Sequence, residues 1–400
     1  MSDTLAPPRL IPIARPVMGE AKLEAVRRPL LSGWLTQGPE VAAFEREFAA
    51  YVGAPYACAV SNCTTALHLA LRAAGVGAGD EVITVSHSFI ATANAIRYCG
   101  AIPVFVDVQP DTYNIDPARL ETARSARTRA ILAVHQLGMP CDLAALVPIA
   151  RRIGVPLIED AACAAGSEIL WDGRWERVGR PHGDVACFSF HPRKVMTTGD
   201  GGMLTTSNAD WDRRFRLWRQ HSMSATDTMR HASRRVVAEE YTELGFNYRL
   251  TDLQAAIGRV QLERLPAMVA GRRAIARRYD ESLRAIRGLQ LPYEPPWARS
   301  NWQSYCVRLP KGVDQMHVMQ SMLDDGVATR RGVMCAHSEP AYRYEPWRSD
   351  GSADALAHSE AIHATGLMLP LYVDMTDDDQ ACVAASLARA IQGANERRCP

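Results

Sequence analysis

One lysine is placed to do covalent chemistry, in the stretch FSFHPRKVMTTGDGG at residues 188–202. Lys194 follows an apolar run, VACFSF, and precedes a turn that contains Gly199, Gly201 and Gly202. Burial lowers the pKa of a lysine amine, and a neutral amine forms a Schiff base with a carbonyl. The alternative is an ordinary surface lysine in a turn, and this stretch by itself leaves both open.

A carboxylate closes a second apolar run, in VPLIEDAACAAG at residues 155–166. Asp160, which follows Glu159, has the charge to pair with the protonated pyridine nitrogen of pyridoxal phosphate and so keep that ring an electron sink. The alternative role for Asp160 is that of a helix N-cap, a position that aspartate favours.

A polar stretch at residues 61–65 could bind phosphate, in SNCTTALHLAL. A strand gives way to a helix here, and the free backbone N–H groups of a helix N-terminus bind anions. Ordinary helix capping by Ser61, Asn62, Thr64 and Thr65 is the alternative.

An aromatic residue lies at the end of the next β-rich run, in SHSFIATANAI. Phe89 could stack on a cofactor ring through its face, although a single aromatic side chain also fits a core position. Taken in chain order, a phosphate cradle, a ring stack, a ring-nitrogen carboxylate and a Schiff-base lysine are the parts of a fold-type I pyridoxal-phosphate enzyme.

The elements that must position these residues alternate between strand and helix. From residue 56 to residue 160, short β-rich runs such as EVITVSHSF and RAILAVHQ are each followed by a helix-patterned segment. This alternation predicts a mainly parallel sheet covered by helices, whose ligands bind beyond the carboxyl ends of the strands. The candidate residues fall at those ends: residues 61–65 and 87–89, His135, Gln136 and Asp160.

A change of pattern after about residue 205 indicates a second part of the chain. Long charged helices follow, including LTDLQAAIGRVQLERLPAMVAGRRAIARRYDESLRAI. We expect an N-terminal segment and a large cofactor-binding domain over residues 1–264, and a smaller α+β domain over residues 265–400.

The composition excludes several classes of protein. The 400 residues are 47% hydrophobic and 22% charged, with a formal charge of +1, which gives no support to a nucleic-acid or membrane partner. The ten cysteines form no CxxC pair, so we expect reduced thiols and no zinc site. Prolines interrupt the N-terminus, MSDTLAPPRLIPIARP, and no apolar run is long enough to span a membrane, so we expect a cytoplasmic protein.

These motifs resemble those of the DegT/DnrJ/EryC1/StrS family of sugar aminotransferases over nearly the whole chain. The similar segments are SGWLTQGPEVAAFEREFAAYVG, SNCTTALHLAL, IEDAACAAGSE, CFSFHPRKVMTTGDGG, GFNYRLTDLQAAIGRVQLERL and LPLYVDMTDDDQ. The resemblance implies the aspartate-aminotransferase fold, with a mainly parallel seven-stranded sheet in the large domain. It implies a pyridoxal-phosphate-dependent aminotransferase, class EC 2.6.1, without a metal.

The resemblance also implies roles for individual residues. Lys194 would form the Schiff base and carry protons, Asp160 would hold the pyridinium, and Phe89 would stack on the ring. The phosphate would be bound by backbone groups of Cys63 and Thr64, by the Ser189 hydroxyl, and by Asn247 of a neighbouring subunit in a homodimer. Two positions depart from the family: Cys63 stands where glycine is usual, and Cys163 stands where glutamine or histidine usually lies near the pyridoxal 3′-oxygen.

The resemblance specifies the substrates less closely than the cofactor. The donor would be L-glutamate or L-glutamine, and the acceptor a cyclic ketone, most often on a nucleotide-linked sugar in a biosynthetic pathway. A cyclitol or an aromatic or heterocyclic precursor is an alternative acceptor, and a non-catalytic cofactor-binding paralogue is an alternative function. A deoxygenating dehydratase of the same family would have histidine in place of Lys194. Candidate substrate contacts are His87, His191, Arg193, Arg249 and His337, although both arginines also suit a dimer interface.

Overall fold

The computed structural model describes residues 10–396. Residues 1–9, which form part of the segment on which the expectation of no signal peptide rests, lie outside the described residues, as does Cys399. No helix among residues 10–396 is long and apolar enough to cross a membrane.

A mainly parallel sheet forms the centre of the molecule, as the sequence predicts. Within the described residues this sheet has eight strands, in the spatial order β1 (Tyr56–Val60), β9 (Gly202–Thr206), β8 (Val185–Ser189), β5 (Leu157–Asp160), β4 (Thr128–Val134), β2 (Glu81–Val85), β3 (Ile102–Val106) and β13 (Arg348–Ser349). Only β9 runs antiparallel to its two neighbours; the other pairs are parallel.

The prediction of seven strands misses β13, which the C-terminal part of the chain contributes. This strand has two residues and no apolar run to mark it. It pairs in parallel with β3, and the Arg348 guanidinium donates a 2.6 Å hydrogen bond to Glu81 Oε2 at the start of β2. The eighth strand is thus held by contacts with segments far away in the chain, and such contacts leave no local sequence pattern.

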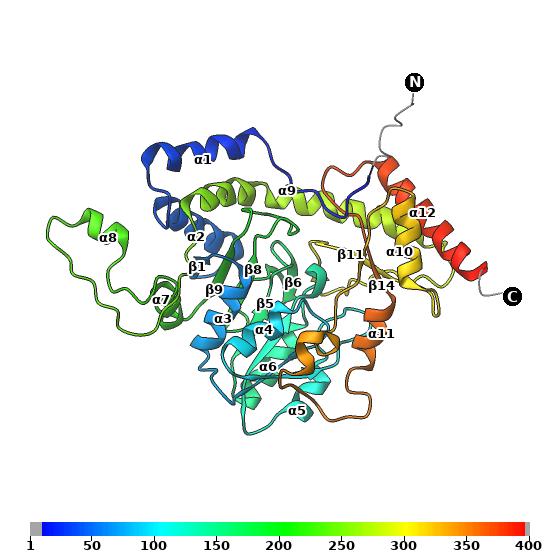
Figure 1. Ribbon diagram of the computed structural model, residues 1–400, viewed down its shortest axis with the longest axis horizontal. Coiled ribbons are helices and arrows are strands. Elements are labelled where there is room, and N and C mark those ends of the chain that lie inside the picture. Colours follow the sequence, from blue (N-terminus) through cyan, green and yellow to red (C-terminus); the bar gives the residue numbers. More distant parts are fainter. Residues whose placement is uncertain (1–9, 397–400) are drawn as a thin grey trace.

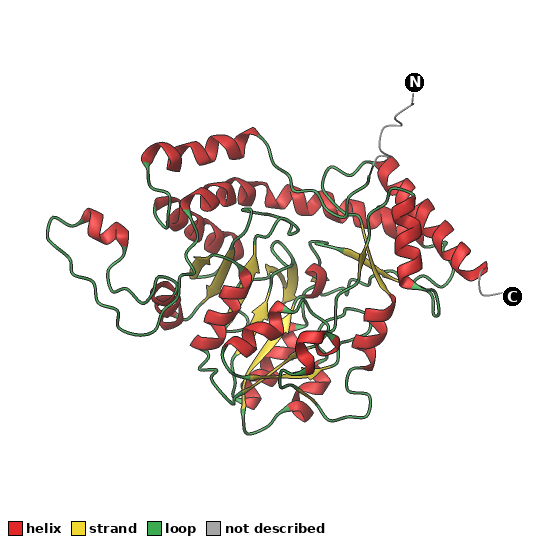
Figure 2. Cartoon of the chain, in the orientation of Figure 1, coloured by secondary structure: helices red, strands yellow, loops and turns green. Residues whose placement is uncertain are grey.

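The sheet is buried on both faces because helices cover it (Figure 2). Alternate residues of β1 show the two sides: Ala57 and Ala59 belong to one apolar cluster, and Cys58 and Val60 to another. The helices in this part of the chain are α1 (Glu20–Ser32), α2 (Pro39–Val52), α3 (Cys63–Ala73), α4 (Ala91–Tyr98), α5 (Leu120–Ala123), α6 (Leu143–Ile153), α7 (Ala209–Trp218), α8 (Asp227–Ala232) and α9 (Asp252–Leu283), with 3-10 turns η1 (Pro117–Arg119) and η2 (Gln136–Gly138).

The C-terminal part builds a separate apolar cluster beside the large sheet (Figure 1). Its elements are β10 (Ala298–Arg299), β11 (Tyr305–Arg308), α10 (Gln315–Asp324), β12 (Arg330–Arg331), η3 (Ala336–Ser338), η4 (Pro340–Arg343), α11 (Ala357–Thr365), β14 (Gly366–Leu369) and α12 (Asp377–Glu396). Strands β11, β14 and β12 form one small sheet, and β10 joins the hairpin of β6 (Glu168–Trp171) and β7 (Arg174–Arg177). The expected boundary between residues 264 and 265 falls inside α9 and stays a prediction.

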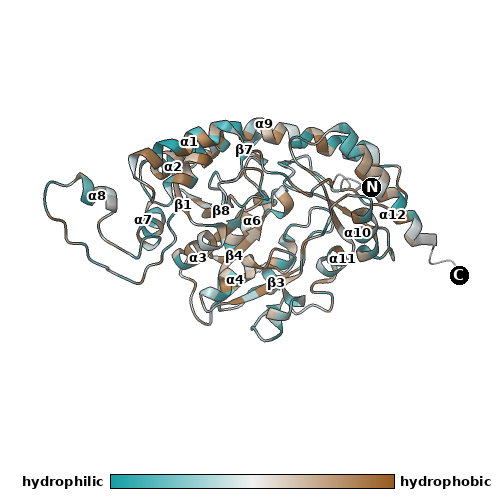
Figure 3. Cartoon of the chain, turned by 45° about the horizontal axis from the view of Figure 1, so that its top comes forward, coloured by the Kyte–Doolittle hydropathy of each residue, from teal (hydrophilic) through white to brown (hydrophobic). Residues whose placement is uncertain are grey.

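The segment between Gln220 and Asn247 carries α8 and projects from the large sheet as an arm (Figure 1, Figure 3). Two isolated β-bridges close its root, Gln220 with Asn247 and Met223 with Tyr241. The arm exposes apolar side chains, including Val236, which is fully exposed, and Leu244, which is 74% exposed. Large exposed apolar side chains on one protruding segment indicate a surface that another molecule covers.

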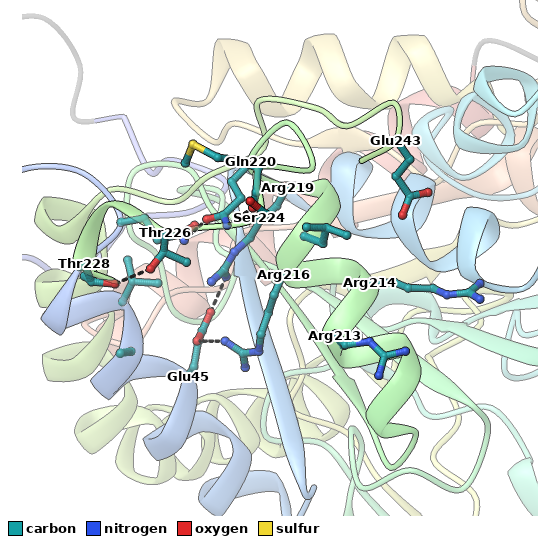
Figure 4. Close-up of a pocket in the computed structure, with 16 residues that line it drawn as sticks. Glu45, Arg213, Arg214, Arg216, Arg219, Gln220, Ser224, Thr226, Thr228 and Glu243 are labelled. Carbon is teal, nitrogen blue, oxygen red and sulfur yellow. Dashed lines mark hydrogen bonds and ion pairs between the residues drawn. The ribbon is translucent and has the colours of Figure 1, made fainter. Parts of the chain in front are cut away.

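Charged side chains close the edge of the sheet at β1, which within residues 10–396 pairs only with β9 (Figure 4). Arg219 donates to the Ala59 carbonyl and Arg216 to the Ala57 carbonyl, both at 2.6 Å, and the Ala59 N–H donates to Glu45 Oε1 at 2.9 Å. Both guanidinium groups also pair with Glu45. Burial raises the pKa of the Glu45 carboxyl, but the two arginines more than offset it, so the net pKa is lowered. The edge is thus satisfied by side chains.

Candidate active site

Lys194 lies in the loop between β8 and β9, where the chain folds back on itself. The Phe190 carbonyl accepts hydrogen bonds from the Thr198 N–H at 3.0 Å and from Thr197 Oγ1 at 2.7 Å. These bonds close the loop and hold the half-buried Lys194 so that its Nζ donates to Cys163 Sγ at 3.1 Å. The surface-turn alternative is therefore wrong.

The pKa of Lys194 moves in the opposite direction to the one expected from burial alone. Burial lowers the pKa of this ammonium, but Cys163, Cys63 and Asp160 face it and raise the pKa, and the net direction is upward. The prediction of a lowered pKa considered only desolvation, whereas here the neighbouring groups have the larger effect on the pKa. Lys194 thus lies among groups that stabilise a positive charge on its nitrogen.

Asp160 ends β5 on the same side of the sheet as Lys194. Its Oδ2 accepts a 2.8 Å hydrogen bond from Thr92 Oγ1, and its Oδ1 accepts one at 3.2 Å from the Ala162 N–H. Burial raises the pKa of this carboxyl. No helix follows Asp160 before β6, so the N-cap alternative is wrong. Thr92 was missed; its only signal is its place one turn after Phe89.

The N-terminus of α3 lies beside the ends of β8 and β9. Asn62 is the N-cap, and its side chain accepts from the Thr65 N–H at 2.9 Å, so the capping alternative is part of the structure. The N–H groups of Cys63 and Thr64 have no acceptor within the helix, because the first turn of a helix lacks them. Cys63 is the first residue of α3 and has no positive φ, so glycine is not needed there.

Gly202 allows the N-terminus of α3, the candidate phosphate site, to lie close to β9. It pairs with Ser189 across β8 and β9, and an added Cβ would lie 2.5 Å from the backbone carbon and oxygen of Asn62 and 2.8 Å from the nitrogen of Cys63. Only a residue without a side chain allows the strand and the helix N-terminus to approach so closely.

The substitution Gly202→Ala is expected to destabilise the fold by about 1–3 kcal/mol, because the new methyl group forces α3 away from β9. It is also expected to weaken pyridoxal-phosphate binding, since the same displacement opens the phosphate cradle. Thermal unfolding and a cofactor titration measure the two effects. Gly77→Ala is the matched control, because its added Cβ would meet only Asp80 Oδ2, at 4.0 Å. Equal effects of both substitutions would contradict the role of Gly202.

Phe89 is available for stacking. Its side chain is 70% exposed just before α4, so it is not the core residue that the alternative proposes. The Phe89 carbonyl accepts a 3.1 Å hydrogen bond from the N–H of Thr92, the residue that bonds to Asp160, and an exposed aromatic face so close in the chain fits a planar ring.

Cys163 is held by a residue from the C-terminal part of the chain that sequence reasoning missed. Asn301 is fully buried, and its Nδ2 donates to the carbonyls of Cys163 at 2.8 Å and of Ala165 at 2.9 Å. Gly138 leaves room for it, since a Cβ there would lie 2.0 Å from Asn301 Oδ1. Asn301 therefore fixes the turn that carries Cys163, and no local motif marks this contact.

Two of the candidate substrate residues, His87 and His337, contact side chains other than Lys194. His87 is fully buried, where desolvation lowers its pKa to about 3, and its ring packs edge-on against Tyr113. His337 pairs with Ser86 Oγ through Nδ1 at 2.6 Å and with Glu360 through Nε2 at 3.2 Å, so its ring is already engaged. Both ring nitrogens of His87, by contrast, lack a hydrogen-bond partner within the described residues.

The remaining candidates are accessible. His191 is exposed, its pKa is lowered by burial of part of the ring, and its Nδ1 accepts from the Arg193 N–H at 3.2 Å. The exposed Arg193 adjoins Lys194 in the chain, and the half-buried Arg249 makes no side-chain hydrogen bond or ion pair within residues 10–396. Asn247 is exposed at the root of the arm.

These residues fit pyridoxal phosphate. The α3 N-terminus with Ser189 suits a phosphate, the Asp160 carboxylate suits a protonated ring nitrogen, and the Lys194 amine suits an aldehyde. Residues 10–396 bring together no three histidine, cysteine, aspartate or glutamate side chains able to hold a metal ion.

The substitution Asp160→Asn keeps the shape of the side chain and one oxygen that accepts a hydrogen bond, but it removes the charge and replaces the other accepting oxygen with a donor NH2 group. We expect turnover to fall about tenfold to a hundredfold, the value of one charge-assisted hydrogen bond, with cofactor affinity reduced. Steady-state rates and a cofactor titration measure this. Glu159→Gln is the control, since Glu159 pairs with His135 at 2.9 Å instead. If Asp160→Asn keeps full turnover and affinity, Asp160 does not hold the ring.

Comparison with known proteins agrees with this geometry. The chain is 36% identical over 390 residues to the spore coat polysaccharide biosynthesis protein SpsC of Bacillus subtilis, covering 96% of this chain and 98% of SpsC. The crystal structure of the aminotransferase TlmJ from Streptoalloteichus hindustanus superposes with a TM-score of 0.87 at 35% identity, covering 96% of this chain and all of TlmJ. DesI, crystallised in the presence of its TDP-sugar product, gives a TM-score of 0.84 at 30% identity, covering 98% of this chain and 95% of DesI.

The model of the DegT/DnrJ/EryC1/StrS aminotransferase family matches residues 16–388. The fold-type I architecture, the pyridoxal-phosphate cofactor and the aminotransferase class predicted from the motifs are thereby confirmed. This chain belongs to the DegT/DnrJ/EryC1/StrS aminotransferase family.

Proposed function

We propose that this aminotransferase moves an amino group from L-glutamate or L-glutamine to a cyclic ketone on a nucleotide-linked sugar, and that it acts as a homodimer. The observation that carries the proposal is the placement of Lys194 Nζ among Cys163, Cys63 and Asp160, at the ends of the strands beside the α3 N-terminus. A lysine amine, a buried carboxylate and a phosphate cradle together are what amino-group transfer requires.

Pyridoxal phosphate, when bound, supplies an aldehyde and a ring that withdraws electrons from the carbon that carries the amino group. Lys194 attaches the cofactor, and its amine then takes the proton from that carbon of the donor and returns one to the acceptor. Asp160 keeps a positive charge on the ring nitrogen, and Thr92 orients the carboxylate. Cys63, Thr64 and Ser189 bind the phosphate, and Phe89 covers one face of the ring.

The nucleotide-linked acceptor is supported by the relatives and by two arginines. DesI has a TDP-sugar product, and SpsC takes part in polysaccharide biosynthesis. Arg193 and Arg249 have guanidinium groups without an ion pair in the described chain, and such groups bind a phosphate or a donor carboxylate. His191 would line the same entrance.

The homodimer is supported by the arm. Asn247 is exposed at its root, and Met229, Tyr241 and Leu244 along it are more than half exposed. A second copy that covers these side chains removes them from water, and Asn247 would then reach the phosphate of that copy.

Absorption spectra of the purified protein test the proposal. With pyridoxal phosphate we expect a band at about 410–430 nm that converts to one near about 330 nm on addition of L-glutamate or L-glutamine. Keto sugars linked to different nucleotides, cyclic ketones without a nucleotide, and aromatic or heterocyclic ketones are then offered as acceptors. Recovery of the first band with nucleotide-linked sugars only supports the proposal. Recovery with another ring overturns the acceptor, and no donor response indicates a non-catalytic paralogue.

A further inference from the structure

We propose that Cys163 is a covalent modification site, open to hydroperoxides and other soft electrophiles while the Lys194 amine is free, and protected once Lys194 holds the cofactor. The protection rests on the proposed attachment of the cofactor to Lys194. Activation of the thiol rests only on the structure.

Exposure separates Cys163 from the other thiols of the chain. Within residues 10–396 the buried cysteines are Cys58, Cys63, Cys99, Cys141, Cys187, Cys306 and Cys335, whereas Cys163 is half-buried and Cys382 on α12 is exposed. Cys163 is thus the one described thiol near Lys194 that a small reagent reaches. Cys382, far along the chain, offers an accessible thiol without a lysine beside it.

Lys194 gives the Cys163 sulfur a partner that stabilises its anion. The 3.1 Å contact from Nζ to Sγ is a hydrogen bond from an amine to a sulfur, and a positive charge beside a thiol favours the reactive thiolate. Arg193 adds a second positive charge that also acts on Cys163. Asn301, through its 2.8 Å bond to the Cys163 carbonyl, holds the backbone of Cys163 in place.

Charged groups of both signs surround this contact: Lys194, Arg193 and Arg330 are basic, and Asp160 and Asp200 are acidic. The Cys63 thiol faces the same site, but burial raises its pKa well above the ordinary value. Cys163 is therefore the thiol at this site that the Lys194 charge activates, through the hydrogen bond from Nζ.

The reaction with hydrogen peroxide can be written in full. The thiolate sulfur attacks one peroxide oxygen, an S–O bond forms and the O–O bond breaks, so that Cys163 becomes a sulfenic acid and hydroxide leaves. The Lys194 ammonium gives that hydroxide a proton, and water departs. Sulfur loses two electrons and the peroxide gains two. The added oxygen lies between Cys163 and Lys194, where it hinders loading of the cofactor.

Pulse labelling with iodoacetamide, read by peptide mass spectrometry, tests the site without measuring turnover. The protein is labelled with and without pyridoxal phosphate, and the rate at Cys163 is divided by the rate at Cys382. We expect Cys163 to react about tenfold faster without the cofactor, and Cys382 to be unchanged. A parallel pulse of hydrogen peroxide followed by dimedone should mark Cys163 as a sulfenic acid under the same conditions.

Two substitutions separate activation of the thiol from simple access. Without cofactor, Lys194→Met removes the charge at similar length and should slow labelling of Cys163 about tenfold, while Lys194→Arg should restore much of the rate. Unchanged labelling in Lys194→Met overturns the proposal. Labelling of Cys163 could instead be slow in Lys194→Met while pyridoxal phosphate fails to protect Cys163 in the unaltered protein. That result would support activation of the thiol by Lys194 and overturn attachment of the cofactor to Lys194.

Discussion

Replacing Lys194 with alanine is expected to lower turnover by at least about 10²–10⁴-fold, the share of a rate enhancement that a positioned acid and base supplies. The loss is larger if covalent attachment of the cofactor also contributes, because the same amine performs both tasks. The fold should change little, since the loop is closed by bonds from Thr197 and Thr198 to Phe190 and not by the lysine side chain.

The lysine content of the chain makes this experiment unusually clear. The sequence has three lysines, Lys22, Lys194 and Lys311, against 42 arginines, the remainder of 45 basic residues. Borohydride reduction of the loaded protein should therefore fix the cofactor on one peptide, the one containing Lys194, and on none in Lys194→Ala. Lys311→Ala, in an exposed turn, is the matched control and should keep both label and turnover. A label on the Lys22 peptide would refute the assignment.

Arg219→Ala is expected to lower the free energy of unfolding by about 3–5 kcal/mol, a larger loss than that expected for Gly202→Ala. Arg219 is 4% exposed, and its removal leaves the buried Glu45 carboxylate with one partner fewer and the Ala59 carbonyl without its 2.6 Å donor. A buried carboxylate that loses one of its two cationic partners and an unsatisfied carbonyl both cost more than the contact itself contributes.

Urea unfolding followed by circular dichroism measures this loss, and α7 provides the control. Arg213 lies on the same helix and pairs with Asp210 at 3.1 Å, but both side chains are mostly exposed. Arg213→Ala should therefore change the free energy of unfolding by no more than about 1 kcal/mol. Similar losses in the two variants would mean that closure of the β1 edge does not depend on Arg219.

The cavity beside this network shows why size alone does not locate the chemistry. A cavity of about 580 Å³ lies between α2, α7 and the arm, and it is lined by Glu45, Arg216 and Arg219 (Figure 4). Lys194, Asp160 and Cys63 do not line it. Glu45, Arg216 and Arg219 in its wall satisfy the sheet edge, and the candidate active site is recognised by residue chemistry instead.

Local patterns in the sequence predicted the parallel sheet and the site residues that lie at strand ends. Lys194, Asp160 and Phe89 each lie within about four residues of the end of an apolar run, so their placement depends on a few neighbouring residues. The sequence did not predict Thr92 or Asn301, because their partners are 68 and 138 residues away along the chain. The pKa direction of Lys194 was missed for the same reason, since the opposing groups come from other loops.

The two buried or half-buried histidines near β2 differ in how the fold uses them. His337 bonds to Ser86 and Glu360 through its ring, whereas neither ring nitrogen of His87 has a hydrogen-bond partner within the described residues. His337 joins η3 to Ser86 at the end of β2, and so fastens the C-terminal part of the chain to the large sheet. A histidine that connects two distant segments has the same local sequence as one that meets a substrate.

The long helix α9 has a consequence for how the protein can be divided. It runs without a break through 32 residues, about 48 Å, and its buried side chains belong first to the core of the large sheet, as with Leu262 and Leu265, and then to the C-terminal core, as with Tyr279 and Leu283. Unfolding of either core would therefore remove part of the helix that packs against the other core. Fragments cut at the expected boundary would share one severed helix, and recombination with relatives is best made at loops, outside residues 252–283.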